Sequence, residues 1–304
     1  MLDLSNLIIQ ESTQVFYANG TNWQVWNKPK NANFVYIYVL GSGAGGGRGA
    51  TGNATTRSGG NGGGSGAICI GLFQANFLPD RLYLQVGVGG AGAPASSLTN
   101  TAGINGSPGA LSYVSITPDS SIPMNLLMVS GAAAPTSTIA GTVFIPALAL
   151  LSNLGMLYST PGSNGSAAGA SSTPATNITL TLPISGGGGG AGCSSVNTAG
   201  GAASINAVST LTPLIPAGAS FGASTTPGGA GGSGYSSTSF ISSYSQHEPL
   251  IFTGGAGGGC SGQGTSGRGG DGEIGCGGGG SGAGQTGVGA GGKGGDGLIL
   301  ITCF

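Results

Sequence analysis

The chain has 304 residues, of which 68 are glycine, and it carries only 7 basic and 8 acidic side chains, for a formal net charge of −1. A chain so poor in Lys and Arg lacks the positive surface that phosphate backbones and anionic lipids attract, so nucleic acid is not an expected partner. Hydrophobic residues make up 38% of the sequence, which is enough to bury a core, and charge-driven disorder is not expected.

The predicted regular elements are short β-strands, because apolar and β-branched residues alternate with polar ones between turn-forming residues. No segment combines helical periodicity with helix caps. The predicted strands span 13–18, 23–26, 34–40, 67–73, 80–88, 111–117, 124–130, 177–183 and 297–303. We therefore predict a single glycine-rich all-β domain over 1–304, with N-terminal strands in 1–40 and a closing strand at 298–304.

Glycine-rich tracts separate these strands at 41–66, 186–192, 228–234 and 254–297, and the last holds 25 glycines in 44 residues. Glycine loses more backbone entropy on folding than any other residue, so such tracts are either disordered or ordered by some unusual packing. The β-like runs between the tracts favour order. Two further stretches, 131–176 and 204–252, are predicted as inserted loop regions, and the first of them is equally compatible with a projecting strand pair.

Glycine recurs at every third residue within the tracts. A period of three fits the extended left-handed helix that has three residues per turn and no internal hydrogen bonds. Collagen needs long proline-rich triplets, which these short runs lack, so we expect many short helices bundled side by side with glycine at their contacts. The predicted structural glycines are Gly43, Gly46, Gly49, Gly264, Gly267, Gly270, Gly272, Gly275, Gly291 and Gly294. The predicted fold is an antiparallel, jelly-roll-like β-sandwich combined with a packed bundle of polyglycine II helices.

Catalytic and cofactor motifs are weak in this sequence. The stretch 39–46 contains G-x-G-x-x-G after a strand, but no helix follows and the next acidic residue is Asp80, too far for a dinucleotide site. Ser220 lies in a G-x-S-x-G match without a strand-to-helix turn. His247 is the only histidine, and one histidine builds neither a metal cluster nor a triad by itself. We expect no enzyme activity, no cofactor and no metal.

The five cysteines, at positions 69, 193, 260, 276 and 303, lie in apolar or glycine-rich surroundings, which favours buried thiols. A Cys260–Cys276 bridge or a metal site is the alternative. The start of the chain has no positive segment before its apolar residues, and the longest apolar run, 142–151, is shorter than a membrane span. We therefore expect neither an export signal nor membrane insertion.

Both ends of the sequence resemble a known family. The stretches "WQVWNKPKNANFVYIYVLGSGAGGGRGA" (23–50) and "GAGGKGGDGLILITCF" (289–304) resemble the glycine-rich domain common in bacteriophage tail-fibre and other virion proteins. Residues Trp26 to Pro29 and Val39 to Gly47 match its first element, and Gly291 to Ile301 match its last. In architecture the chain is also similar to the glycine-rich module of anaplastic lymphoma kinase receptors and to polyglycine-helix adhesins at phage fibre tips.

This resemblance implies a non-enzymatic virion protein on the particle exterior, made in the host cytoplasm, that recognises a host cell-surface protein or glycan as the tip of a tail fibre. Its partners would be that receptor and other virion proteins, with a homotrimer and a monomer on a trimeric stalk both open. The expected receptor-binding residues are aromatic side chains and one histidine in Ser/Thr-rich sequence. They are Phe221, Tyr235, Phe240, Tyr244 and His247.

Three alternatives remain open at this level. The aromatic residues of that loop would equally serve to cap the glycine bundle. The whole chain would equally serve as a structural virion component, such as a head fibre, a decoration protein or a fibre connector. Ice binding is a more distant alternative, because polyglycine bundles present flat surfaces, although no long regular threonine face is present in the sequence.

Overall fold

The computed structural model describes residues 12–52, 57–131, 155–162, 164–168, 186–192, 252 and 254–304. Most regular structure in these residues is β-strand, joined by two short 3-10 helices, η2 (Ala75–Phe77) and η3 (Pro123–Asn125). The strands are β1 (Ser12–Tyr17), β2 (Gln24–Asn27), β3 (Phe34–Leu40), β4 (Ile68–Gln74), β5 (Arg81–Gln85), β6 (Ser112–Ser115), β7 (Leu126–Ser130), β8 (Met156–Thr160) and β9 (Leu298–Cys303).

The strands form two antiparallel sheets. The five-stranded sheet has the order β1-β9-β3-β4-β8, and the four-stranded sheet has the order β2-β5-β6-β7. The last strand, β9, is inserted between β1 and β3, so the two ends of the described chain meet in one sheet. For the residues that the structure describes, the prediction of β-strands with antiparallel pairing and almost no helix is confirmed.

One hydrophobic core is shared by the two sheets. Alternate residues of β3, namely Val35, Ile37 and Val39, are fully buried, as a period of two requires for a sheet with one face inward. Trp26 on β2 and Leu84 on β5 reach the same core from the four-stranded sheet. The same alternation of apolar and polar residues that predicted the strands therefore places apolar side chains in the core.

The other face of the five-stranded sheet carries apolar rather than charged side chains, and none of its five strands contains a charged residue. Leu40 and Leu298, at the ends of β3 and β9, form a second buried cluster with Phe252 and Cys276. This cluster lies where the strands pass into the glycine-rich segments. The two regions of the molecule are thus joined through side chains.

Two predicted elements need comment. The predicted strand 177–183 and the glycine tract 228–234 lie outside the described residues. The inserted region 131–176 is not loop throughout, because it contains β8, which pairs with β4 at the edge of the five-stranded sheet. The Ala, Ser, Thr and Pro composition of that region obscured a strand of only five residues.

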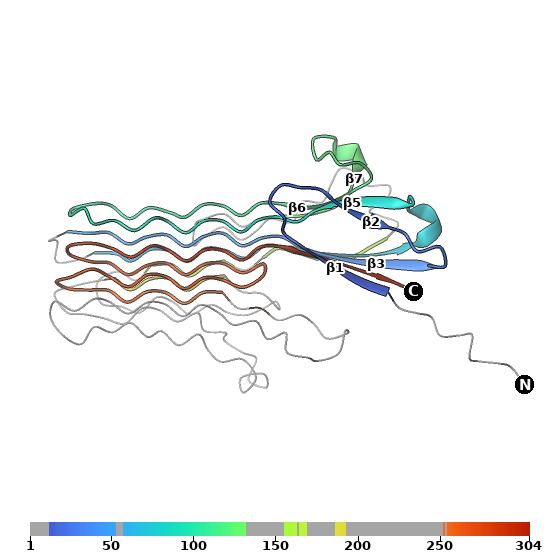
Figure 1. The fold of residues 1–304 in the computed structure, drawn as a ribbon. Coiled ribbons are helices and arrows are strands. Elements are labelled where there is room, and N and C mark those ends of the chain that lie inside the picture. The colour runs from blue at the N-terminus through green and yellow to red at the C-terminus, as the bar shows by residue number, and fades with distance from the viewer. Residues whose placement is uncertain are drawn as a thin grey trace, which may run out of the picture.

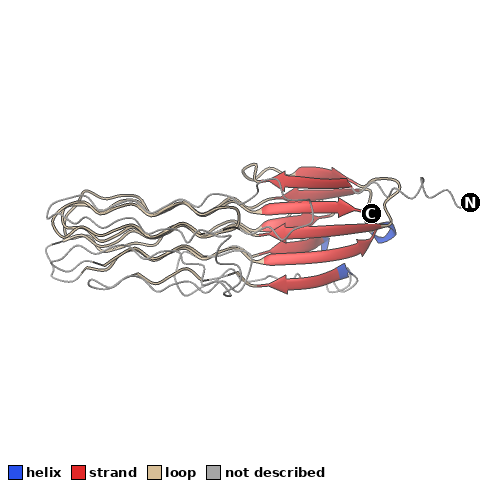
Figure 2. Ribbon diagram, turned by 90° about the horizontal axis from the view of Figure 1, so that it is seen from below, coloured by secondary structure: helices blue, strands red, loops and turns tan. Residues whose placement is uncertain are grey.

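The glycine-rich segments extend away from one end of the sheets, side by side (Figures 1 and 2). Segment 41–52 leaves β3 and segment 57–66 leads into β4, while 86–111 joins β5 to β6 and 254–297 leads into β9. The C-terminus lies at the opposite end of the strands. The reversals that carry Thr51 and residues 98–101 therefore lie far from the sheets, at what we call the far end, whereas the turn at Gly275 packs against Leu40 at the end of β3.

Backbone hydrogen bonds link each segment to several neighbours with a period of three. Consecutive amides of segment 276–283 donate in turn to segments 43–52, 267–272 and 186–192, and then to the same three again. The pairs are Gly278 to Ala44, Gly279 to Gly270, Gly280 to Gly188, Ser281 to Gly47, Gly282 to Gly267 and Ala283 to Ala191, with N···O distances of 2.8–3.1 Å. Three consecutive residues thus point in three directions.

Carbonyl groups complete the surroundings of this segment. Those of 276–283 accept hydrogen bonds from amides of 57–66, 254–261 and 289–297. Buried backbone groups must be paired, and here the partners come from other segments rather than from a sheet ladder or an α-helix. Segment 276–283 is therefore enclosed by hydrogen-bonded neighbours on all sides.

Close backbone approach explains why these positions are glycine. A Cβ at Gly279 would overlap the carbonyl oxygen of Ala256, and a Cβ at Gly280 would overlap that of Gly60. The obstacle in each case is backbone, which cannot rotate away as a side chain can. The contacts therefore require a residue without a side chain.

Candidate functional site

The residues predicted to contact a receptor, Phe221, Tyr235, Phe240, Tyr244 and His247, lie outside the described residues. Of the predicted loop region 204–252 only Phe252 is described, and it is buried in the cluster that joins the sheet to the glycine-rich segments. The assignment of those residues to receptor binding stays a prediction.

The predicted structural glycines lie at contacts between neighbouring segments. For six of them a Cβ would overlap a backbone carbonyl of the adjacent segment. The pairs are Gly43 with Cys276, Gly46 with Gly279, Gly49 with Gly282, Gly272 with Gly277, Gly291 with Gly46 and Gly294 with Gly43. Gly43 and Gly46 take part in two such contacts each, because their own carbonyls lie close to Gly294 and Gly291.

The remaining four predicted glycines have other roles. Gly275 has φ +72°, and a Cβ there would also overlap the side chain of Leu40, so glycine suits both the turn and the packing. The backbone amides of Gly267 and Gly270 donate to neighbouring segments, and the carbonyl of Gly264 accepts from Gln285 at 2.9 Å.

At the far end, side chains tie the chain reversals together. The hydroxyl of Thr51 donates to the carbonyl of Leu98 at 2.7 Å and accepts from the amide of Thr101 at 2.9 Å. The loop that Thr51 holds has Asn100 in the left-handed region, with φ 58°, and leaves the Leu98 side chain 67% exposed. The far end thus presents an apolar side chain on an anchored loop.

Arg57 is a buried cation at the same end. Its side chain donates from Nη1 to the carbonyl of Gly52 at 2.7 Å and from Nη2 to that of Gly262 at 3.2 Å, while Nε has no hydrogen-bond partner. No ion pair joins it to a carboxylate in the described part of the chain. The Arg57 guanidinium therefore links two chain reversals by donating hydrogen bonds to a backbone carbonyl of each.

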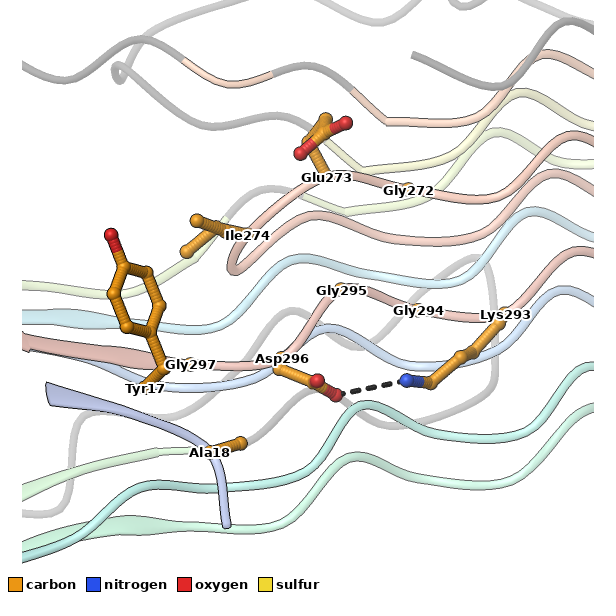
Figure 3. Close-up of a pocket in the computed structure, with 10 residues that line it drawn as sticks. All are labelled: Tyr17, Ala18, Gly272, Glu273, Ile274, Lys293, Gly294, Gly295, Asp296 and Gly297. Carbon is orange, nitrogen blue, oxygen red and sulfur yellow. Dashed lines mark hydrogen bonds and ion pairs between the residues drawn. The ribbon is translucent and has the colours of Figure 1, made fainter. Parts of the chain in front are cut away.

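A pocket of about 250 Å³ lies at the junction between the glycine-rich segments and the five-stranded sheet (Figure 3). We call it the junction pocket. Its side nearer the sheet is formed by Tyr17, at the end of β1, and by Ala18. Lys293 lies on the side of the glycine-rich segments, and Glu273 and Asp296 lie between. The remaining lining residues are Ile274, Gly272, Gly294, Gly295 and Gly297.

Ion pairs fix two of the charged side chains of the pocket. Lys293 Nζ lies 3.1 Å from Asp296 Oδ1, and the same oxygen accepts the backbone amide of Gly89 at 2.8 Å. Next to the pocket, Asp271 pairs with Arg268 at 2.8 Å and accepts the amide of Lys293 at 2.7 Å. Exposed pairs of this kind stabilise the fold by about 0–1 kcal/mol, so their main effect is on side-chain position.

Two other side chains of the junction pocket are available to a ligand. The carboxylate of Glu273 forms no ion pair or hydrogen bond with any residue that the structure describes. The Tyr17 side chain is 57% exposed and stands beside Ile274 at the sheet side. The pocket therefore offers an unpaired carboxylate and an open aromatic ring, next to a lysine and a second carboxylate that hold each other in place.

Sequence reasoning missed this pocket. Lys293 and Asp296 each stand between two glycines and Glu273 follows one, which predicts only that they point out of the packed segments. Tyr17 belongs to a strand predicted on alternation alone. Five of the chain's few charged residues gather in 268–296, which is a weak signal of a surface, but nothing in the sequence places Tyr17 beside them.

The cysteines agree with the prediction of buried thiols. Cys69, Cys260, Cys276 and Cys303 are buried thiols, so the alternative Cys260–Cys276 bridge is wrong, and Cys193 lies outside the described residues. Burial raises the pKa of the Cys69 thiol to about 11, which suppresses the reactive thiolate.

Two searches of the described residues were negative. No three His, Cys, Asp or Glu side chains gather in this part of the chain as they would around a metal ion. Nor does the same part contain a helix with the length and apolar character to cross a bilayer.

Comparison with known proteins adds one finding. A family model described as a glycine-rich domain matches residues 18–304, which is nearly the whole chain and includes every described strand except β1 and all the described glycine-rich segments. No curated protein matches the chain at a significant level.

Proposed function

The chain belongs to the family of glycine-rich domains, and from this premise we propose that its glycine-rich segments are polyglycine II helices packed in a bundle beside a β-sandwich. Support comes from the hydrogen bonds of segment 276–283, in which every third amide donates to the same neighbour. Three residues per turn without internal hydrogen bonds is the geometry of this helix. The core shared by the two sheets supports the sandwich.

An experimental structure tests this proposal directly. We expect the segments to rise about 3.1 Å per residue with φ near −75° and ψ near +145°. Segments that wander as irregular coil in such a structure would contradict it.

We propose that this bundle serves as a rigid, almost uncharged support in a non-enzymatic bacteriophage virion protein, the receptor-binding tip of a tail fibre. The supporting observation is that the glycine-rich segments hold chain reversals, such as the Thr51–Thr101 loop contact, far from the sheets. Binding surfaces are commonly carried on loops that a rigid scaffold positions. The partners would be a host cell-surface protein or glycan and other virion proteins on the particle exterior.

The proposed contact residues for the receptor are Phe221, Tyr235, Phe240, Tyr244 and His247. The test replaces Tyr235, Phe240 and Tyr244 together by alanine and measures adsorption of the particle to host cells. The matched control is Phe77→Ala, which removes an aromatic side chain that is 56% exposed near the sheets. We expect the triple variant to lose at least about tenfold in binding and the control to keep it.

The outcomes separate the two candidate roles. A folded triple variant with unchanged adsorption would remove this loop from the receptor site. A purified chain that binds virus particles but never cells would make the protein a structural virion component, such as a head fibre, decoration protein or fibre connector.

A further inference from the structure

We propose that the junction pocket binds a neutral carbohydrate, with one sugar ring against Tyr17 and its hydroxyl groups on Glu273, Asp296 and Lys293. This inference concerns a site on the flank of the molecule, away from the far end. It does not depend on the protein being part of a virion.

The size of the pocket limits the ligand. A volume of about 250 Å³ is below the roughly 300–1,000 Å³ of sites for drug-sized ligands, so one ring of a small molecule fits and a folded peptide does not. The pocket is partly open to solvent, so further sugar units of a chain would extend out of it.

The distribution of polarity matches a sugar ring. Tyr17, Ala18 and Ile274 give an apolar side toward the sheet, whereas Asp296 and Lys293 line the pocket from the glycine-rich segments and Glu273 lines it from the turn beside Ile274 (Figure 3). A pyranose has the same division, with C–H groups on its ring faces and hydroxyl groups at its rim. An exposed tyrosine presents a flat aromatic surface that loses little conformational entropy on binding.

The polar groups suit hydroxyl groups in particular. The Glu273 carboxylate accepts hydrogen bonds only and has no donor within the described chain, so it would take one or two ligand hydroxyls. Asp296 uses Oδ1 for Gly89 and Lys293, which leaves Oδ2 as a second acceptor. The Lys293 ammonium has three protons, of which Asp296 takes one, so the pocket also supplies donors.

The charges argue against ionic ligands. Glu273, Asp296 and Lys293 sum to −1, so an anion would be repelled. For a cation, Asp296 is already paired with Lys293, so Glu273 is the one unpaired carboxylate of the pocket. Glu273 is half-buried, and a single ion pair in a partly solvated setting adds little. A neutral ligand that both donates and accepts uses all three side chains without displacing the existing pair.

The test uses the full chain and a panel of glucose, galactose, mannose and N-acetylglucosamine, with saturation-transfer NMR to detect binding and titration to measure affinity. We expect saturable millimolar binding of at least one sugar. Glu273→Gln and Tyr17→Leu should each weaken it about tenfold, because a charge-assisted hydrogen bond or the aromatic surface is lost. Asp80→Asn, which alters a 96% exposed carboxylate on another part of the surface, should leave it unchanged.

Three results would overturn the proposal. One is the absence of binding to every sugar of the panel, and another is binding that both pocket variants retain while their melting temperatures match the parent. The third is saturable binding of tetramethylammonium in preference to any sugar, which would make the pocket a cation site. None of these results depends on cell adsorption by the 221–247 loop, so the two proposals fail separately.

Discussion

The sheet region and the glycine-rich segments are buried to a similar degree, but by different groups. In the sheets, large side chains such as Trp26, Ile37 and Leu84 fill the space between two layers of backbone. In the glycine-rich segments the backbones themselves touch, and the buried residues around 276–283 are mostly glycine with some Ala, Ser and Cys. Burial of apolar surface stabilises the sheet region. Many backbone hydrogen bonds between neighbouring segments stabilise the glycine-rich region.

This difference teaches that the two regions tolerate opposite kinds of substitution. A sheet core accepts exchanges that conserve volume and is damaged by loss of volume. The glycine-rich segments have no volume to lose and cannot accept even one methyl group at a contact. Each net hydrogen bond contributes only about 0.5–1.5 kcal/mol, so their stability depends on keeping the whole set.

Adding a side chain at a segment contact should have the largest effect. Gly46→Val would drive its Cβ into the carbonyl oxygen of Gly279, a backbone atom held by neighbours on all sides. We expect a loss of at least about 3 kcal/mol in the free energy of unfolding, at or beyond the upper end of ordinary overpacking. Urea denaturation followed by circular dichroism measures it.

The matched control for that variant is Ser107→Val in the neighbouring segment. Ser107 is exposed, so the same side chain should change the free energy of unfolding by less than about 0.5 kcal/mol. If both variants lost the same stability, it would not matter whether the valine points into a neighbouring segment or into solvent. The explanation by close backbone contacts would then be wrong.

Removing volume from the sheet core should come next. Trp26 is 1% exposed and lies in the core that both sheets share, so Trp26→Ala should cost about 3–5 kcal/mol. Thermal unfolding of this variant and of Gly46→Val also tests whether the regions melt together. Separate transitions, with the glycine-rich segments surviving the loss of Trp26, would mean that each region folds alone.

Alkaline pH should weaken the sheet region selectively. Burial, with smaller contributions from Tyr36 and Cys276, raises the pKa of Tyr38 above its ordinary value of about 10, and burial also raises the pKa of Tyr36 and Tyr113. The unfolded chain then releases these protons first. Stability should be fully present below pH 10 and fall above it, by at most about 1.4 kcal/mol per pH unit for Tyr38.

Urea midpoints at pH 8, 10 and 11 check this dependence, with Tyr38→Phe as the comparison. The variant should lose less stability between pH 10 and 11 than the parent. No tyrosine occurs in 254–297, so no phenol of the last glycine-rich tract takes part in the effect. An equal loss in the parent and the variant would exclude Tyr38 as its source.

The smallest effect is expected in thiol labelling, which compares the rates at which buried cysteines of the two regions react. Cys69 and Cys303 lie in the shared core, whereas Cys260 and Cys276 lie in the glycine-rich segments, and all four are buried. In a Cys193→Ser background we expect an aromatic disulfide reagent at pH 8 to label none of them until the protein unfolds. Faster labelling of Cys260 and Cys276 than of the other two would show that the glycine-rich segments open independently.

Local pattern was sufficient for much of the fold. Alternation in 34–40 predicted a strand that is β3, and the C-terminal run predicted β9, because strand formation depends on residues two apart. The period of three at Gly43, Gly46 and Gly49 also predicted where backbones come closest. The sequence left 131–176 open between a loop and a strand pair and did not locate β8, because five residues in small-residue sequence carry too short a pattern.

The sequence alone determined that the regular elements are strands and which positions had to be glycine, since both follow from residues two or three apart. It also determined the near absence of charge, which follows from composition. Only the tertiary structure decided that β9 lies between β1 and β3, that segment 276–283 lies at the centre of its neighbours, and that Tyr17 and Glu273 line one pocket. The physical reason is that all glycine-rich segments present the same backbone N–H and C=O groups to their neighbours. A glycine-rich segment carries no side chains that select one partner over another, so strand pairing and chain connectivity choose its neighbours and thereby create the junction pocket.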